Sequence, residues 1–205
     1  MEAVLWTPPA VAPAMAALVC HPHPVFSGTM HNKVVFQAAK ALDSLGIAVL
    51  RFNFRGAGLS NGIYDQGRGE IDDTRTALEF LTTEFPAVPL LVAGFSFGCW
   101  VGMRAGCEDA RVEKLIGMGA PVNNADFSYL GKCAKAKLFV HGSNDEHGDV
   151  EKVRQLVASL PGANELVVVD GVDHFFTGKI EELGKAIVGW LKPVAHNVAK
   201  SSSHD

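Results

Sequence analysis

The sequence has no apolar stretch that approaches the roughly 18 consecutive residues a membrane-spanning helix needs, so we expect no membrane span. It also has no run of basic residues: 18 Lys and Arg stand against 22 Asp and Glu, for a formal net charge of -4. Because a surface that binds phosphate backbones must be positive, nucleic acid is not an expected partner. The apolar segment 10–20 does not have the pattern of a signal peptide, since nothing basic precedes it, Glu2 is acidic and Pro13 interrupts it.

Cysteine is scarce, and its four copies form no CxxC pair. A chain of 205 residues can bury a sufficient core without disulfides, so we expect reduced thiols and a cytoplasmic protein. One alternative is a metal cluster made of Cys20, His21, His23 and His31. The prolines at 22 and 24 restrict the imidazoles and no carboxylate joins the group, so the sequence favours no metal site and no cofactor.

The chain does contain an alternation of short apolar runs with longer segments of helical periodicity. The apolar runs predict strands at 16–20, 47–54, 90–94, 115–118, 137–141 and 165–169. The periodic segments predict helices at 32–45, 72–84, 97–105, 150–160 and 180–191. Strands that are continuous apolar runs are typical of a parallel sheet covered by helices on both faces. We therefore expect one α/β domain over residues 1–194, followed by a disordered tail over 195–205.

Residues 94–98 are Gly-Phe-Ser-Phe-Gly, a GxSxG motif with Ser96 at its centre. The motif follows one predicted strand and precedes a predicted helix, which is where a nucleophilic serine on a tight turn would stand. Gly94 and Gly98 lack the Cβ that would obstruct such a turn. Chance would produce the motif about 0.1 times in a chain of this composition. Its position between strand and helix therefore carries the prediction that Ser96 is a nucleophile.

A serine nucleophile needs a histidine to accept its proton and a carboxylate to orient that histidine. His174 follows the last predicted strand, and Asp145 follows the strand before it, 29 residues earlier. Both loops then lie at the carboxyl edge of a parallel sheet, in the chain order serine, acid, histidine. The sequence thus predicts Asp145 and His174 as the catalytic partners of Ser96. The alternatives are His147 as the base and, as the acid, Glu146, Asp149 and Asp173.

The negative oxygen of a tetrahedral intermediate needs preorganised backbone N–H donors. The amide of Phe97 is one candidate, because it opens a helix directly after the serine. The second donor is expected in the loop after the strand 16–20, where proline, which has no N–H, excludes positions 22 and 24. This leaves His23, Val25 or Phe26. We favour His23, because the prolines on both sides would hold its amide in place.

These motifs together resemble the small α/β-hydrolases related to dienelactone hydrolase, in particular a bacterial group of about this length. The shared marks are HPHP at 21–24, RFNFRGAGLS at 51–60 and GxSxG at 94–98, and the resemblance covers nearly the whole chain. It implies an α/β-hydrolase fold and a Ser-His-Asp triad at Ser96, His174 and Asp145, with esterase-like activity. Dienelactone hydrolase itself has a cysteine as its nucleophile, so its substrate does not carry over.

Many relatives of this fold carry a lid after the strand predicted at 115–118. Only residues 119–136 separate that strand from the next, too few for a substantial cap, so we expect an open site. A site lined by Val25, Phe26, Phe95 and Phe97 would suit a small or flexible ester, hydrolysed through an acyl-enzyme. The alternatives are a thioesterase, an amidase or an acyltransferase with the same triad, and a binding module of this fold without activity.

Overall fold

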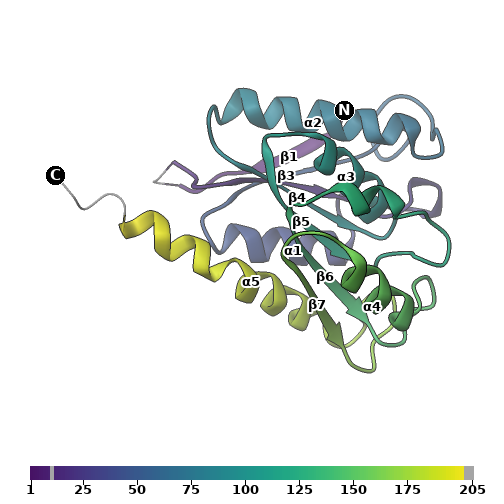
Figure 1. Ribbon diagram of the computed structural model, residues 1–205. Helices are drawn as coiled ribbons and strands as arrows, with labels where there is room; N and C mark the ends of the chain where they lie inside the picture. The colour runs from purple at the N-terminus through teal and green to yellow at the C-terminus, as the bar shows by residue number, and fades with distance from the viewer. Residues whose placement is uncertain (10–11, 201–205) are drawn as a thin grey trace.

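Seven strands form one mostly parallel sheet at the centre of the described part of the protein (Figure 1). The computed structural model describes residues 1–9 and 12–200, without the side chains of 193–200. The strands are β1 (Ala3–Trp6), β2 (Ala16–Cys20), β3 (Ala48–Phe52), β4 (Leu90–Phe95), β5 (Val112–Met118), β6 (Ala136–Gly142) and β7 (Asn164–Val169). Their order is β1-β3-β2-β4-β5-β6-β7, with β1 antiparallel to β3 and all other neighbours parallel. The predicted α/β architecture is confirmed.

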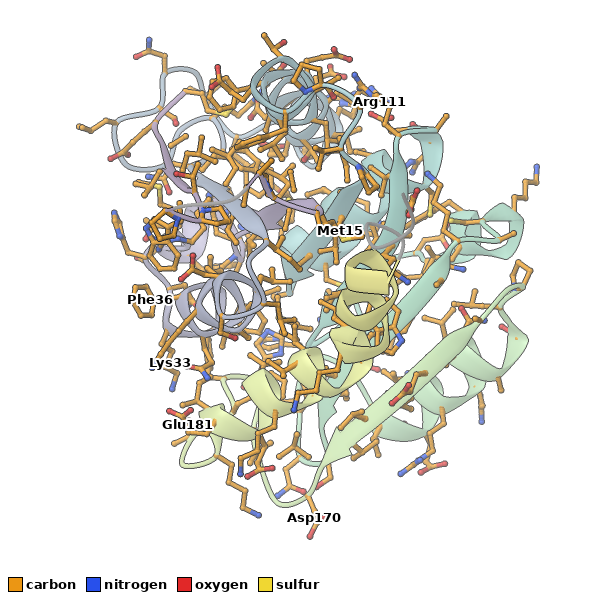
Figure 2. All side chains as sticks on the ribbon, turned by 90° about the vertical axis from the view of Figure 1, so that its left-hand side faces the viewer. Met15, Lys33, Phe36, Arg111, Asp170 and Glu181 are labelled. Carbon is orange, nitrogen blue, oxygen red and sulfur yellow. The ribbon has the colours of Figure 1, made fainter. Side chains whose placement is uncertain are left out.

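Helices cover both faces of this sheet. They are α1 (Lys33–Asp43), α2 (Arg68–Glu84), α3 (Phe97–Glu108), α4 (Val150–Ser159) and α5 (Ile180–Lys200). One hydrophobic core lies between the sheet and α1 and α5, and a second lies between the sheet and α2, α3 and α4. Figure 2 shows α1 beside α5, with Lys33 and Phe36 on α1 and Glu181 at the start of α5. Gln37 Nε2 donates a hydrogen bond of 3.2 Å to Glu181 Oε2 across this contact.

The central strands β2 and β4 are apolar throughout because both of their faces are buried. In β4, Leu91, Ala93 and Phe95 pack into the core under α1 and α5, whereas Leu90 and Val92 pack into the other core. This alternation buries the Phe95 side chain completely. The structure therefore corrects the predicted pocket role of Phe95, which lies beneath the site and not on its wall.

Two differences from the predicted elements have a clear physical cause. The edge strand β1 was not predicted, because it has only four residues and pairs with a single neighbour. Helix α2 begins at Arg68, four residues before the predicted start at 72. The buried carboxylate of Glu70 accepts hydrogen bonds from the amides of Asp65 (2.8 Å) and Gly67 (2.7 Å), which caps the helix at this earlier point.

The segment 119–135 between β5 and β6, all of it described, contains a single short 3-10 helix, η2 (Ser128–Lys132). As expected, this segment does not form a substantial lid. Helix α5 continues to Lys200, beyond the predicted domain end at 194, and residues 201–205 of the predicted tail lie outside the described residues. None of the helices in the described ranges combines the length and apolarity needed to cross a membrane.

Candidate active site

Ser96 stands on a sharp turn between β4 and α3. Its backbone has φ 55° and ψ -119°, a left-handed conformation that costs a non-glycine residue roughly 1–3 kcal/mol. The turn needs both glycines of the motif. A Cβ on Gly94 would collide with the Gly98 carbonyl, and a Cβ on Gly98 would lie 2.5 Å from the carbonyl oxygens of Cys20 and His21. The strained turn and the close approach of the loop after β2 thus depend on residues that have no side chain.

The two predicted partners of Ser96 lie beside it, although they are distant in the chain. The Ser96 hydroxyl donates to His174 Nε2 at 2.8 Å, and His174 Nδ1–H donates to Asp145 Oδ2, also at 2.8 Å. A carboxylate can only accept, so Nδ1 carries the proton and Nε2 is free to accept the proton of the hydroxyl. His174 and Asp145 are both buried, whereas Ser96 is part-exposed. This is the geometry that a nucleophile, a base and an orienting acid require.

The surroundings of Asp145 keep its carboxylate ionised. Burial raises the pKa of Asp145, but the hydrogen bond from His174, the nearby imidazoles of His174 and His141 and the amide of His147 outweigh it, so its pKa is lowered. The amides of His147 (2.8 Å) and Gly148 (3.1 Å) both donate to Asp145 Oδ1. Each carboxylate oxygen therefore has a donor, and the side chain is held in one orientation.

The alternative acids have other partners. Asp149 caps α4 by accepting from the amides of Glu151 and Lys152, each at 3.0 Å. Asp173 accepts from the amides of Phe175 and Thr177 within its own loop. Glu146 Oε2 accepts from the amide of His174 at 3.4 Å, so it contacts the histidine loop through the backbone.

Two further histidines lie close to the three residues: His147, which the sequence offered as the alternative base, and His141, which it did not assign to the site. The ring of His147 meets the ring of His174 edge-on, with centroids 4.5 Å apart. His141 is fully buried, its Nε2–H donates to the Gly148 carbonyl at 2.7 Å, and the same nitrogen is 3.6 Å from Asp145 Oδ2. Nothing in the sequence distinguishes His141 from any other packed residue of a strand, which is why it was not assigned to the site.

The first histidine of HPHP supports the loop after β2. His21 is fully buried, donates from Nδ1–H to the Pro22 carbonyl at 2.6 Å and accepts at Nε2 from the Phe54 amide at 2.9 Å. Burial lowers the pKa of His21 to about 4, partly offset by the bond to Pro22, so the ring is neutral at ordinary pH. Since both of its nitrogens are engaged, His21 is not available as a metal ligand. It instead fixes the start of the loop that carries His23.

The RFNFRG segment holds the far end of the same loop. Arg51 Nη1 donates to the Met30 carbonyl at 3.0 Å, and Asn53 Oδ1 accepts from the Met30 amide at 2.7 Å. Both side chains are buried. The two sequence marks, HPHP and RFNFRG, are thus parts of one hydrogen-bonded support for the loop between β2 and α1.

The candidate oxyanion donors can be compared by the bonds they already make. The Val25 amide donates to His23 Nδ1 at 3.3 Å, and the Phe26 amide donates to the His23 carbonyl at 3.1 Å. By contrast, within the described residues the amides of His23 and Phe97 donate no hydrogen bond. The rings of His23 and Phe97 are in contact, with centroids 4.9 Å apart. The two free amides therefore belong to segments that pack together beside Ser96.

A cavity of about 580 Å³ opens at Ser96. The residues that line it are Pro22, His23, Phe26, Ser27, Gly28, Asn32, Tyr64, Ser96, Phe97, Trp100, Pro121, Asn124, Ala125, His147, His174 and Phe175. Phe26 is on this wall as predicted, although 80% exposed, whereas Val25 and Phe95 are not among the lining residues. Tyr64 and Trp100 were missed, of which Trp100 could have been found because it lies one helical turn after Ser96.

Residues 25–137 match the family model described as serine aminopeptidase, S33. The chain belongs to this family of α/β serine hydrolases. An uncharacterized protein of Rickettsia prowazekii is 39% identical over 193 residues, which cover 90% of this chain and 81% of that protein. An α/β serine hydrolase homologue from Coxiella burnetii is 37% identical, with a TM-score of 0.87 and coverage of 92% of this chain and 90% of that one. A serine hydrolase without a lid from Xanthomonas campestris is also 37% identical, with a TM-score of 0.86 and coverage of 93% and 88%. The resemblance to small cap-less α/β-hydrolases is confirmed.

Proposed function

We propose that this α/β hydrolase cleaves carboxylic esters, with Ser96, His174 and Asp145 as its catalytic triad. The family supports hydrolysis as the class of reaction. The observation that carries the proposal is the hydrogen-bonded path from the Ser96 hydroxyl through His174 to Asp145, with both links 2.8 Å long. Esterases of Pyrococcus furiosus and Rhodothermus marinus share the fold, with TM-scores of 0.78 and 0.74 at 19% and 21% identity. That likeness concerns the fold, and the ester substrate is part of our proposal.

In the first half of the reaction, Ser96 Oγ attacks the carbonyl carbon while His174 Nε2 accepts the hydroxyl proton. The bond to the alcohol oxygen then breaks, and His174 gives this proton to the departing alkoxide. In the second half, His174 takes a proton from water as the water oxygen attacks the acyl-enzyme. The acid leaves and Ser96 regains its proton. Asp145 stays ionised throughout and stabilises the imidazolium form of His174.

The amides of His23 and Phe97 form the oxyanion hole in this mechanism. Each such donor contributes about 10²- to 10³-fold to the rate, and the N-terminus of α3 adds the favourable end of its dipole. The loop and the helix meet where Gly98 has no side chain. Their separation is thus set by backbone packing before a substrate binds, which is what preorganised stabilisation requires.

The variant Ser96→Ala tests the proposal. We expect hydrolysis of p-nitrophenyl acetate to fall by about 10⁶-fold and labelling by a fluorophosphonate probe to disappear. Ser159→Ala is a matched control, because Ser159 is an exposed serine whose hydroxyl bonds within α4. It should retain both signals. Ester hydrolysis that survives in Ser96→Ala, or folded wild-type protein that the probe does not label, refutes the triad.

The class of substrate needs a separate comparison. An ester, a thioester and an amide with the same acyl group differ only in the bond that is cleaved. We expect the highest kcat/KM for the ester. A higher value for the thioester or the amide would assign the site to one of those reactions, and transfer of the acyl group to an added alcohol in preference to water would indicate an acyltransferase.

A further inference from the structure

The aromatic side chains around Ser96 form two separate groups. One group contains His174, with His147, Phe175 and Phe95 in ring contact with it. The other surrounds Phe97, whose ring contacts those of His23, Tyr64 and Trp100 at centroid distances of 4.9, 5.9 and 5.9 Å. No ring contact joins the two groups among the described residues. Ser96 lies between them in the chain, since its neighbours Phe95 and Phe97 belong to different groups.

The second group forms a fixed surface, which we call the aromatic wall: Tyr64, Phe97 and Trp100. Trp100 is held at two points, because its Nε1–H donates to the Asp126 carbonyl at 3.0 Å and its own carbonyl accepts from the Tyr129 hydroxyl at 2.8 Å. A Cβ on Gly67 would lie 2.6 Å from Trp100 Cζ3, so the loop that carries Tyr64 approaches the indole at a glycine. The rings are therefore ordered before a ligand arrives.

The chemistry at Ser96 assigns the two groups to different halves of a substrate. His174 must protonate the departing alkoxide, so the alcohol part lies on the side of His174, His147 and Phe175. The carbonyl oxygen points to the amides of His23 and Phe97. The remaining substituent of the carbonyl carbon, the acyl chain, is then directed away from His174, toward the aromatic wall.

The cavity wall has no carboxylate, ammonium or guanidinium group among its described residues. Its described lining residues include no Asp, Glu, Lys or Arg. A charged group on the acyl chain would lose its hydration there without a counter-charge, which is unfavourable. Rings stacked against rings, by contrast, gain attraction beyond the burial of apolar area. The wall therefore selects for a flat and uncharged group.

We propose that the preferred substrates are esters whose acyl group carries an uncharged aromatic ring, which packs against the aromatic wall. This inference rests on the proposed ester hydrolysis, and it deepens it by assigning the acyl group. It also separates this site from one that takes peptide N-termini, because an α-ammonium group would find no carboxylate on the described wall.

The test compares three ethyl esters that share the alcohol: 3-phenylpropanoate, 3-cyclohexylpropanoate, and 3-phenylpropanoate with a carboxylate in the para position. Proton release at constant pH measures their hydrolysis. We expect kcat/KM for the phenyl ester to exceed that for the cyclohexyl ester by roughly 2- to 12-fold, the range of one aromatic contact. The carboxylate should lower kcat/KM by at least about tenfold. A phenyl-to-cyclohexyl ratio of one or less, or a carboxylate without effect, overturns the inference.

Variants then locate the ring. Tyr64→Leu and Trp100→Leu should each move the phenyl-to-cyclohexyl ratio toward one, because the side chain stays apolar but is no longer aromatic. Phe80→Leu is the matched control, since Phe80 lies on α2 and is 44% exposed away from the cavity, and it should keep the wild-type ratio. If Tyr64→Leu and Trp100→Leu also keep the wild-type ratio, the phenyl ring of the substrate does not bind at the aromatic wall and the inference fails. If neither variant folds, the wild-type comparison of the three esters still decides.

The acetate assay distinguishes this inference from the proposed function. Wild-type protein that hydrolyses p-nitrophenyl acetate through Ser96, but shows no preference for the phenyl ester, refutes the inference alone. Folded protein that hydrolyses no ester refutes the proposed function, and with it the inference that rests on it.

Discussion

Replacing His21 by Gln removes the ring that joins the HPHP loop to Phe54, two residues after the end of β3. It also removes a group whose pKa differs between the folded and the unfolded chain. Burial lowers the pKa of His21 from its ordinary value of 6.5 to about 4. Below pH 6.5 the unfolded chain therefore binds a proton at His21, which the folded protein binds only when the pH approaches 4. The folded state loses stability as the pH falls from about 6.5 toward 4, and is unaffected above that window.

The magnitude follows from the two pKa values. Linkage makes the full loss about 3 kcal/mol at or below pH 4, of which about 2 kcal/mol is lost between pH 7 and pH 5. At pH 7, His21→Gln should itself be less stable by roughly 1–3 kcal/mol, because it leaves the buried Phe54 amide or Pro22 carbonyl without a well-placed partner. The variant should then lose about 2 kcal/mol less than wild type when the pH is lowered to 5.

Urea unfolding at pH 7, 6 and 5, followed by circular dichroism, measures both effects for wild type and His21→Gln. Carboxylates such as Asp145 titrate in both proteins, so their contribution cancels in the difference between them. Parallel stability curves for the two proteins across this range would refute the assignment of His21 as a buried neutral histidine. Because the loop carries the proposed oxyanion donor, kcat of the variant should also fall, by up to about 10²-fold.

Three further variants test other parts of the site. Asp145→Asn should lower kcat for p-nitrophenyl acetate by about 10⁴-fold, because the amide no longer selects the His174 tautomer. The control Asp173→Asn changes a carboxylate that bonds within its own loop, so it should keep most of the activity. Equal losses of kcat in the two variants would contradict the choice of Asp145 as the acid. Gly98→Ala should lower Tm and soluble yield, since the new Cβ would collide with backbone of the loop after β2; a wild-type Tm would show that this contact can relax at no cost. Asn53→Ala should lower kcat by roughly tenfold, with KM nearly unchanged, because the Met30 amide loses its partner and the loop with the proposed oxyanion donor loosens. An effect on KM alone would place the role of Asn53 in substrate binding.

Much of the fold could be predicted because its strands are buried on both faces. Such strands are mostly apolar, and the runs at β2, at β4 and in the middle of β6 (residues 138–140) stand out for that reason. The edge strand β1 has one neighbour and a half-exposed surface, so it has no comparable signal. The early start of α2 depends on the buried Glu70, whose capping role is visible only when its contacts are known.

Which side chains line the cavity was harder to predict from the sequence. Phe95 was expected there, but strand alternation directs it into the core under α1 and α5. Tyr64 lies in a loop with no periodic pattern, and it reaches the site through contacts with His23 and Phe97. Loops are positioned by packing between distant segments, which local sequence does not report.

By itself, the sequence determined the sheet-and-helix alternation, the GxSxG turn and the residue types of the proposed triad, because these depend on local hydrophobicity, on glycine and on chain order. Only the tertiary structure decided that His174 lies 2.8 Å from both Ser96 and Asp145, and that His21 and Asn53 hold the ends of one loop. It also decided that an uncharged aromatic wall faces Ser96. The physical reason is that distances between residues 23 to 78 positions apart follow from the packing of whole strands and helices, whereas a motif is formed within one turn.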